Sequence, residues 1–379
     1  MKIAFISNFL SAHQQPVCDA LAHMLDVEFR FIALTPISQT RKQMGWKDLN
    51  DTDYVIKAYI NEEEKKALDF VSGADVAIFG HDKVDIYFKS AIRNRHSIVF
   101  RCSERLYKQG RWRALSPRGI WNRWNTYYCY PKENQYLLCA SAYAAKDFAL
   151  LGSYLGKSFK WGYFPPVDFY DIELRISQKK HGSIFWAGRM LSWKHPETAI
   201  YIAKQLREKQ IPFELNMAGD GPMFDEIQGM VKREQLEKSV HLLGNCSPEI
   251  VRKYMADSQI YLATSDYQEG WGAVVNEAMA EGCAVVACEA MGAGPYLIQS
   301  GKNGYLFHFG RNDIACEQVA KLLLNKKLCD SFIKAAYQTI QEDWSADCAA
   351  QRLVQLSKAL LNGNGCVFFS GPCSKAELL

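Results

Sequence analysis

At residues 269–287 the chain reads Glu-Gly-Trp-Gly-Ala-Val-Val-Asn-Glu-Ala-Met-Ala-Glu-Gly-Cys-Ala-Val-Val-Ala. The glycines let the backbone bend and leave room beside it, so the carboxylate of Glu269 can approach a polar ligand closely. The helical pattern of 272–281 holds a second carboxylate, that of Glu277, in a fixed orientation in its first turn. Two carboxylates placed in this way suit the binding of a sugar's hydroxyl groups at two points.

The apolar segment 284–287 reads as a strand that follows this helix, and the same alternation recurs along the chain. Helical patterns also cover 197–209 and 223–234. Strands that alternate with helices predict an α/β fold with parallel sheets and crossover helices. The predicted strands are 2–7, 27–34, 75–79, 97–101, 136–140, 159–163, 183–187, 213–217, 239–243, 259–263, 284–287 and 304–307.

The sequence Phe164-Pro165-Pro166-Val167-Asp168 interrupts this alternation, because two prolines halt regular structure. The 379 residues are enough for two domains of ordinary size. We therefore predict two Rossmann-like domains, 1–165 and 166–345, whose parallel sheets face each other across a cleft. Residues 346–379 are predicted to form a terminal helix, which can pack on either domain, and a loosely held tail rich in glycine.

The composition excludes several classes of protein. Hydrophobic residues make up 48% and charged residues 23% of the chain, as in ordinary globular proteins. The 12 cysteines include no Cys-x-x-Cys pair, so the spacing of a metal site is absent. The first residues lack a signal-peptide pattern, and no segment approaches the ~20 apolar residues that span a bilayer. We therefore expect a cytoplasmic protein with reduced thiols.

Glycine, charged and small polar residues follow four predicted strands of the second domain. In an open parallel sheet, ligands bind at the carboxyl ends of the strands, so these residues are expected to line one rim. The residues are Gly188, Arg189 and Lys194 after 183–187, Ala218-Gly219-Asp220-Gly221-Pro222 after 213–217, Gly244 and Asn245 after 239–243, and Thr264, Ser265, Asp266 and Glu269 after 259–263.

Arg189 and Lys194 are suited to hold a diphosphate. The planar guanidinium matches phosphate oxygens, and the lysine supplies a mobile point charge. An isolated Gly-Arg pair is usually a solvated loop, but the neighbouring rim motifs favour the binding role. The helix start near Gly272 adds backbone N–H donors, which stabilise an anion by roughly 0.3–1 kcal/mol. If these groups neutralise the diphosphate, no divalent metal is needed.

In this order and spacing, the Gly188-Arg189…Lys194 motif, the Ala218–Pro222 turn and Glu269-x7-Glu277-Ala-Met-Ala-x-Gly resemble the retaining GT-B glycosyltransferases of family GT4. The resemblance covers 183–310 closely, and the first domain only in its alternation. It implies a GT-B fold, a nucleotide diphosphate sugar as donor, and no metal or other cofactor. By the same resemblance Arg189 and Lys194 bind the diphosphate, Glu277 the ribose, Glu269 the sugar hydroxyls, and the backbone near Asn245 the base. The implied donor-binding set is Arg189, Lys194, Gly219, Asn245, Glu269, Gly270, Trp271, Gly272 and Glu277, of which Arg189, Lys194 and Glu269 also take part in catalysis.

The acceptor side is assigned to the first domain, where the motifs match the family less well. Where the family commonly has a Gly-Gly pair, this chain has Ser7-Asn8-Phe9-Leu10-Ser11-Ala12-His13. His81, after the strand 75–79, is the candidate for the family's catalytic histidine, although a surface or capping histidine would fit equally well. Glu104 follows the strand 97–101. The predicted acceptor-side residues are therefore His13, His81 and Glu104.

Residues 101–132 contain eight Lys/Arg and one acidic residue, Glu104, with three tryptophans and four tyrosines interleaved. This composition is typical of a surface that contacts anionic lipid headgroups. It also suits single-stranded nucleic acid, and it suits a loop region whose aromatic side chains pack inward. Beside a predicted glycosyltransferase rim, we favour lipid and expect no nucleic-acid partner. A lipid-diphosphate-linked acceptor would account for both features.

We therefore predict a retaining hexosyl- or N-acetylhexosaminyltransferase for glycan or lipid-linked acceptors in cell-surface polysaccharide or glycoconjugate synthesis, located on the inner face of the cytoplasmic membrane. Three other interpretations stay open. The first is a glycosidase that uses Glu269 and Glu277 as its pair of carboxylates. On a single helix these two residues would lie about 12 Å apart, whereas the carboxylates of a retaining glycosidase lie about 5 Å apart. The Gly-Trp-Gly break permits other geometries, so the interpretation stays open. A nucleotide-sugar epimerase and a non-catalytic binding subunit are the alternatives from other classes. The base, sugar and acceptor are not specified by the sequence.

Overall fold

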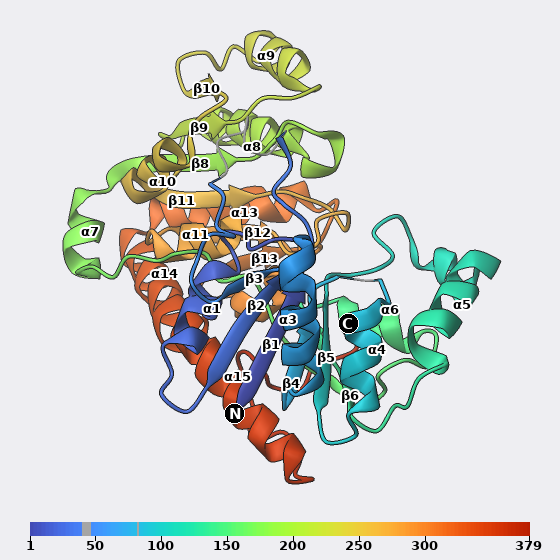
Figure 1. Ribbon diagram of the computed structural model, residues 1–379. Coiled ribbons are helices and arrows are strands. Elements are labelled where there is room, and N and C mark those ends of the chain that lie inside the picture. The colour runs from blue at the N-terminus through green and yellow to red at the C-terminus, as the bar shows by residue number, and fades with distance from the viewer. Residues whose placement is uncertain (40–46, 82) are drawn as a thin grey trace. The chain divides into compact units, whose positions relative to one another are not determined.

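The computed structural model describes residues 1–39, 47–81 and 83–379. The chain forms two compact units, each with its own parallel sheet (Figure 1). The first unit comprises Met1–Pro166 and Trp344–Leu379, and the second comprises Val167–Asp343. The predicted α/β architecture of two parallel sheets with crossover helices is confirmed.

The described part of the first unit holds a seven-stranded sheet in the order β3-β2-β1-β4-β5-β6-β7. Every strand pair is parallel, with Lys2 opposite Glu28 between the two first strands. The strand Val55–Lys57 was not predicted from the sequence, because three residues are too few to show the alternation of polar and apolar side chains. The strands are β1 Lys2–Ser7, β2 Glu28–Ala33, β3 Val55–Lys57, β4 Val76–Phe79, β5 Ile98–Ser103, β6 Gln135–Cys139 and β7 Ser158–Lys160.

Helices pack on this sheet through their apolar side chains. Phe88 of α4 is fully buried and contacts Phe79 of β4, with ring centroids 5.2 Å apart. The described helices are α1 Gln15–Ala22, α3 Asn61–Ser72, α4 Ile86–Arg93, α5 Pro117–Arg123, α6 Ala144–Ala149 and α15 Ala346–Leu361, with a short 3-10 helix η1 Arg111–Leu115 and a π-helical turn η2 Trp124–Tyr128.

The C-terminal segment completes the first unit. Helix α15 packs on α1 through buried side chains such as Leu353 and Leu356. The prediction of a loosely held tail is wrong, because the segment around Cys373 pairs antiparallel with the edge strand β7. The backbone N of Lys160 donates to the Ser374 carbonyl at 2.7 Å, and the Cys373 backbone N donates to the Lys160 carbonyl at 2.7 Å. The tail thereby covers a sheet edge that would otherwise present unpaired backbone groups.

The second unit holds a six-stranded parallel sheet in the order β10-β9-β8-β11-β12-β13. From β8 the chain moves outward to β10 on one side, and it then returns to β11 on the other side of β8. The neighbouring strands β8 and β11 therefore mark the topological switch point, where open α/β sheets bind ligands. The strands are β8 Lys180–Ala187, β9 Glu214–Ala218, β10 Val240–Gly244, β11 Ser258–Ala263, β12 Ala284–Cys288 and β13 Tyr305–Phe307.

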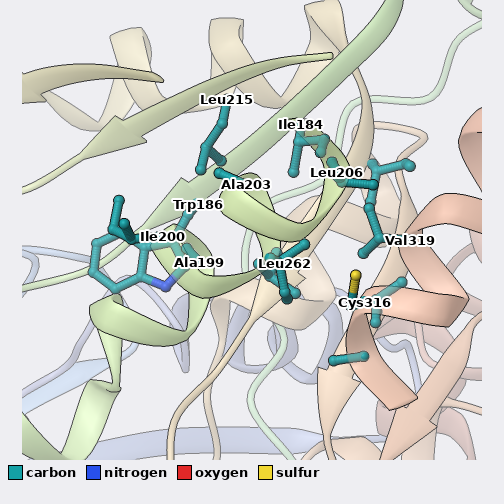
Figure 2. Packing of buried hydrophobic residues seen from close by; sticks show 14 of the residues in the cluster. Ile184, Trp186, Ala199, Ile200, Ala203, Leu206, Leu215, Leu262, Cys316 and Val319 are labelled. Carbon is teal, nitrogen blue, oxygen red and sulfur yellow. The ribbon is translucent and has the colours of Figure 1, made fainter. Parts of the chain in front are cut away.

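The core of the second unit lies between the sheet and helices α8 and α13 (Figure 2). In α8, Ala199, Ala203 and Leu206 recur at helical spacing on the buried face, and the two alanines let the helix approach Trp186 and Leu215 of the sheet. Burial of one Leu or Ile side chain contributes about 1.5–3 kcal/mol. The helices are α7 Ile172–Gln178, α8 Pro196–Glu208, α9 Phe224–Arg233, α10 Pro248–Asp257, α11 Val274–Ala280, α12 Gly294–Leu297, α13 Asn312–Leu324 and α14 Lys326–Gln338, with short turns η3 Ser192–Lys194 and η4 Thr339–Asp343.

In the described residues, every helix is too short or too polar to cross a lipid bilayer.

Candidate active site

Two loops meet at the switch point of the second unit. The loop after β8 carries Lys194 and the loop after β11 carries Glu269, and the lysine ammonium forms an ion pair with the carboxylate. The two side chains are only 16% and 13% exposed, so the pair is largely shielded from water. The structure thus brings together two residues that the sequence analysis placed in one rim.

Buried hydrogen bonds fix the spacing of these two loops. The indole N–H of Trp186 donates to the hydroxyl of Thr264 at 2.9 Å, and that hydroxyl donates to the carbonyl of Lys194 at 2.6 Å. Thr264 therefore links the end of β8 to the end of β11. The sequence analysis noted Thr264 only as a small polar residue and missed Trp186 altogether.

His195 forms a second link between the same loops. Its Nδ1 lies 2.7 Å from a carboxylate oxygen of Glu197, and its Nε2 lies 3.3 Å from a carboxylate oxygen of Asp266. Asp266 in turn accepts the backbone N–H of Gln268 at 2.7 Å, one residue before Glu269. Hydrogen bonding to Glu197, followed by its charge and by Asp266, raises the pKa of His195. His195 was not predicted, because one of its two carboxylate partners, Asp266, is distant in the sequence and is brought near by the fold.

Replacing His195 with asparagine tests this link, and asparagine tolerates the left-handed backbone at this position, where φ is 49°. Because the folded pKa is raised, the stabilisation by His195 is fully present below the unfolded pKa near 6.5 and is lost as the pH rises through the folded pKa. We expect the variant to lose about 1 kcal/mol at pH 6, roughly 2–4 °C in melting temperature, and much less at pH 9.

Melting curves of the wild type and His195→Asn across this pH range measure the difference. The variant His241→Asn is the control, since His241 is more exposed and lies 3.9 Å from its nearest carboxylate oxygen. A difference between wild type and His195→Asn that stays constant with pH would contradict the proposed charge pairing.

The loops after β8, β9 and β10 approach one another through glycines. The Gly219 backbone N donates to the Gly244 carbonyl at 2.7 Å, and the Gly188 backbone N donates to the Ala218 carbonyl at 3.0 Å. A Cβ on Gly219 would lie 1.9 Å from the Gly188 carbonyl oxygen, and φ of Gly219 is +135°, so only glycine fits there. These backbone hydrogen bonds therefore join the ends of β8, β9 and β10.

Arg189 and Asn245 lie exposed on this rim. Within the described part of the chain, no side chain or backbone group forms a hydrogen bond or ion pair with the Arg189 guanidinium. This charge is therefore available to an anion that approaches from solvent, whereas Lys194 is paired with Glu269 in the ligand-free protein.

Glu277 lies in the first turn of α11 and is partly buried. Burial raises the pKa of its carboxyl group; Arg252 opposes the shift and Glu281 adds to it. Among the described residues, none forms a hydrogen bond or ion pair with the Glu277 carboxylate. The nearby Glu281 differs, because Arg252 donates to its carboxylate at 2.9 Å. The Glu277 carboxylate is thus shielded from water, and it receives no hydrogen bond from the described residues.

The conformation of the Gly-Trp-Gly loop before α11 is fixed by the buried side chain of Trp271. Trp271 is buried, its indole N–H donates to the Asn276 amide oxygen at 2.8 Å, and its carbonyl accepts the Ala293 backbone N–H at 2.8 Å. Gly270 and Gly272 are also buried, and φ of Gly272 is +89°. The Trp271 side chain therefore supports the loop from within, and the surface of the loop is left to the backbone and to Glu269.

The predicted acceptor-side residues follow β1, β4 and β5, three neighbouring strands of the first unit. His13 stacks on Tyr163 with ring centroids 5.8 Å apart, and the Tyr163 hydroxyl donates to Glu104 at 2.6 Å. The other Glu104 oxygen pairs with Lys108 at 2.6 Å. Burial lowers the pKa of His13, which favours a neutral ring. His13 and Glu104 thus belong to one cluster.

His81 has a different set of contacts. Its Nε2 lies 3.3 Å from a carboxylate oxygen of Asp85. Asp85 caps α4 by accepting the Phe88 backbone N–H at 2.9 Å. These contacts place His81 at the start of a helix. This matches the capping histidine that was the alternative to a catalytic role. In the ranges that the structure describes, no three His, Cys, Asp or Glu side chains form a group suited to a metal ion.

Comparison with known proteins agrees with the geometry of the second unit. Residues 173–339 match the family model described as Glycosyl transferases group 1. The chain is similar to HepE of Anabaena in a crystal structure with UDP, at 16% identity and a TM-score of 0.66 over 94% of this chain and 100% of that one. It is also similar to a glycosyltransferase from Rickettsia africae, at 14% identity and a TM-score of 0.66 over 96% and 99% of the two chains. These likenesses show that the fold is GT-B.

Curated relatives match over shorter stretches. The chain is 28% identical over 169 residues to poly(ribitol-phosphate) alpha-N-acetylglucosaminyltransferase of Staphylococcus aureus, which is 44% of this chain and 34% of that protein. It is 30% identical over 138 residues to N-acetyl-alpha-D-glucosaminyl L-malate synthase of Bacillus anthracis, which is 36% of this chain and 35% of that protein. The match thus spans about a third of the length of these relatives.

Proposed function

We propose that this chain is a retaining glycosyltransferase. It transfers a hexose or N-acetylhexosamine from a nucleotide diphosphate sugar to a glycan or lipid-linked acceptor, in the synthesis of cell-surface polysaccharides or glycoconjugates. The observation that carries the proposal is the buried carboxylate of Glu277, which receives no hydrogen bond from the described residues and, like Glu269 of the Lys194–Glu269 pair, acts on the Tyr261 hydroxyl.

A buried carboxylate that receives no hydrogen bond costs stability, so it is kept where a ligand supplies the missing donor. A ribose offers two hydroxyl groups as donors, which Glu277 can accept as charge-assisted hydrogen bonds. Glu281, four residues further along the chain, is by contrast paired with Arg252. The contrast between Glu277 and Glu281 supports a binding role for Glu277.

The diphosphate then contacts Arg189 and Lys194. Breaking the donor's glycosidic bond leaves negative charge on the departing phosphate, and fixed cations stabilise this charge in the transition state. Glu269 is held by Lys194, which favours a role in orienting sugar hydroxyls over covalent attack on the sugar. In the mechanism that we propose, an oxygen of the leaving phosphate accepts the proton of the acceptor hydroxyl, on the face where the new bond forms, and the anomeric configuration is retained.

The first donor to test is UDP-N-acetylglucosamine. The two relatives described above are named for N-acetylglucosaminyl groups, and a solved structure of the same fold contains UDP. UDP-glucose and the GDP-, ADP- and CMP-sugars complete the set. A donor at 100 times its Kd should stabilise the protein by roughly 2.7 kcal/mol, which a thermal-shift measurement resolves easily.

The same samples then receive an acceptor glycan, and release of nucleotide is measured with and without it. We expect one nucleotide sugar to raise the melting temperature and to release its nucleotide faster with acceptor. No stabilisation by any nucleotide sugar would overturn the proposal. Conversion of the donor to an epimer without acceptor would assign the chain to a nucleotide-sugar epimerase instead.

A further inference from the structure

Three tryptophans and one isoleucine of the first unit lie exposed on and beside α5. The exposed fractions are 69% for Trp112, 65% for Trp121, 56% for Trp124 and 51% for Ile120. Ile120, Trp121 and Trp124 are spaced so that they share one side of the helix that runs from α5 into η2, and η1, which contains Trp112, contacts α5. These four residues are called the tryptophan face. Figure 1 shows α5 at the periphery of its unit, beyond α4 and α6.

The opposite side of the same helix faces the protein interior. The guanidinium of Arg123 packs over the ring of Phe148, 4.5 Å from its centroid. The Tyr127 hydroxyl accepts the backbone N–H of Tyr154 at 3.1 Å. The amphipathic pattern is therefore reversed relative to an ordinary surface helix, with an arginine inside and large apolar side chains outside.

The segment that leads into the tryptophan face is firmly held by the buried carboxylate of Asp147. It accepts the backbone N–H groups of Leu106 and Tyr107 at 3.0 and 3.1 Å. Asp147 also accepts a hydrogen bond from the Arg111 guanidinium at 3.2 Å. Ser116 caps the start of α5, because its hydroxyl accepts the Gly119 N–H at 3.1 Å. The tryptophans are therefore exposed on an ordered support.

The charged residues of the segment that carries this face have one sign. From residue 105 to residue 132 the sequence has seven Lys/Arg and no Asp or Glu. Arg105 and Arg111 are used in pairing with Asp147, whereas Arg113 and Arg118 are exposed. The fold thus divides the basic residues into an inward group that holds the segment and an outward group beside the tryptophans.

We propose that the tryptophan face docks the first unit onto a lipid bilayer that contains anionic lipids. Indole rings are favoured at the level of the headgroups, where one end meets apolar chains and the other meets water. Each arginine near an anionic surface adds about 1 kcal/mol, or about fivefold in affinity, at low salt. Trp121 and Trp124 enter the boundary between headgroups and acyl chains, while Arg113 and Arg118 contact lipid phosphates.

Two other occupants fit the face less well. A second copy of this chain, joined by a two-fold axis, would place two surfaces of the same positive charge against each other, and a stable interface would need about 800 Å² from each copy. Single-stranded nucleic acid usually binds aromatic side chains that line a basic groove. Here the apolar side chains stand on the outer side of a helix, the geometry of an interfacial membrane anchor.

Sedimentation of the full chain with phosphatidylcholine vesicles, with and without phosphatidylglycerol, tests the proposal. We expect binding that needs phosphatidylglycerol and weakens as salt is added. The double variant Trp121→Ala/Trp124→Ala should bind on the order of tenfold more weakly or worse. Arg113→Ala/Arg118→Ala should lose about 25-fold at low salt and less at high salt.

Phe369→Ala and Arg93→Ala are the matched controls, because both residues are exposed in the same unit outside this face. Both should bind like the wild type, and all variants should melt at the wild-type temperature. Wild-type protein that does not bind anionic vesicles, or tryptophan variants that bind equally well, would overturn the proposal. Self-association or binding to a single-stranded homopolymer that depends on the tryptophans, without vesicle binding, would assign the face to another partner. None of these measurements requires sugar transfer, so the result is independent of the proposed activity.

Discussion

Replacing Arg189 with alanine should lower the kcat of sugar transfer by about 10²–10³-fold, equivalent to about 2.7–4 kcal/mol of transition-state stabilisation. The guanidinium is exposed and pairs with no described residue, so the folded state loses little when it is removed. The melting temperature should therefore stay close to that of the wild type. Initial rates of UDP release across donor concentrations separate an effect on kcat from an effect on KM.

Arg189→Lys and Arg233→Ala complete this experiment. Lysine keeps the charge but not the planar pair of donors, so Arg189→Lys should fall between the wild type and the alanine variant. Arg233 is an exposed arginine in the last turn of α9 and should be neutral to activity. If Arg189→Ala retained full activity, the diphosphate would have to be held elsewhere, and the assignment of this rim as the donor site would be wrong.

Replacing Glu277 with glutamine should change binding and stability in opposite directions. Donor affinity should fall by about 10- to 100-fold, because a hydrogen bond to a charged group contributes about 1.5–3 kcal/mol. The ligand-free protein should become more stable by about 1 kcal/mol at neutral pH, or about 2–4 °C. The folded pKa of Glu277 is raised by burial, so its favourable contribution exists below the unfolded pKa near 4.3 and is lost as the pH rises through the folded value. The gain from Glu277→Gln should therefore disappear in acid.

Glu281→Gln is the matched control for this experiment. Glu281 pairs with Arg252 and also lies 3.7 Å from Arg175. Loss of its charge should destabilise the protein while donor affinity stays unchanged, the reverse of the result expected at Glu277. Calorimetric titration with the donor and melting curves of both variants give the comparison. A Glu277→Gln variant that is less stable and still binds donor normally would identify Glu277 as a structural residue.

The arrangement of the second unit was largely predictable from sequence, for a simple geometric reason. Carboxyl ends of parallel strands share one edge of a sheet, so Lys194 and Glu269, which follow two apolar segments, were expected on the same rim. Their adjacency needed one further fact, the strand order that places β8 beside β11. His195 could not be found in this way, because its link between the loops depends on Asp266, which comes from the loop after β11.

In the first unit, composition alone does not decide which side chains are buried and which are exposed. The basic and aromatic residues of 101–132 were evident, but the inward and outward groups could not be told apart. That division depends on Asp147, which lies more than 30 residues beyond Arg111 and receives it in the folded chain. The C-terminal tail was mispredicted for a similar reason. Its glycines indicate a flexible segment locally, whereas its pairing with β7 is formed between residues more than 200 positions apart.

The first unit is built from both ends of the chain, and this has a consequence for synthesis on the ribosome. Residues Val167–Asp343 are complete before Trp344–Leu379 have been translated. The later half can therefore acquire its native structure while the earlier half still lacks the helix that packs on α1 and the cover of its outermost strand. Domains usually fold in the order in which they emerge. In this protein the order of completion is reversed, and the half that begins first is finished last.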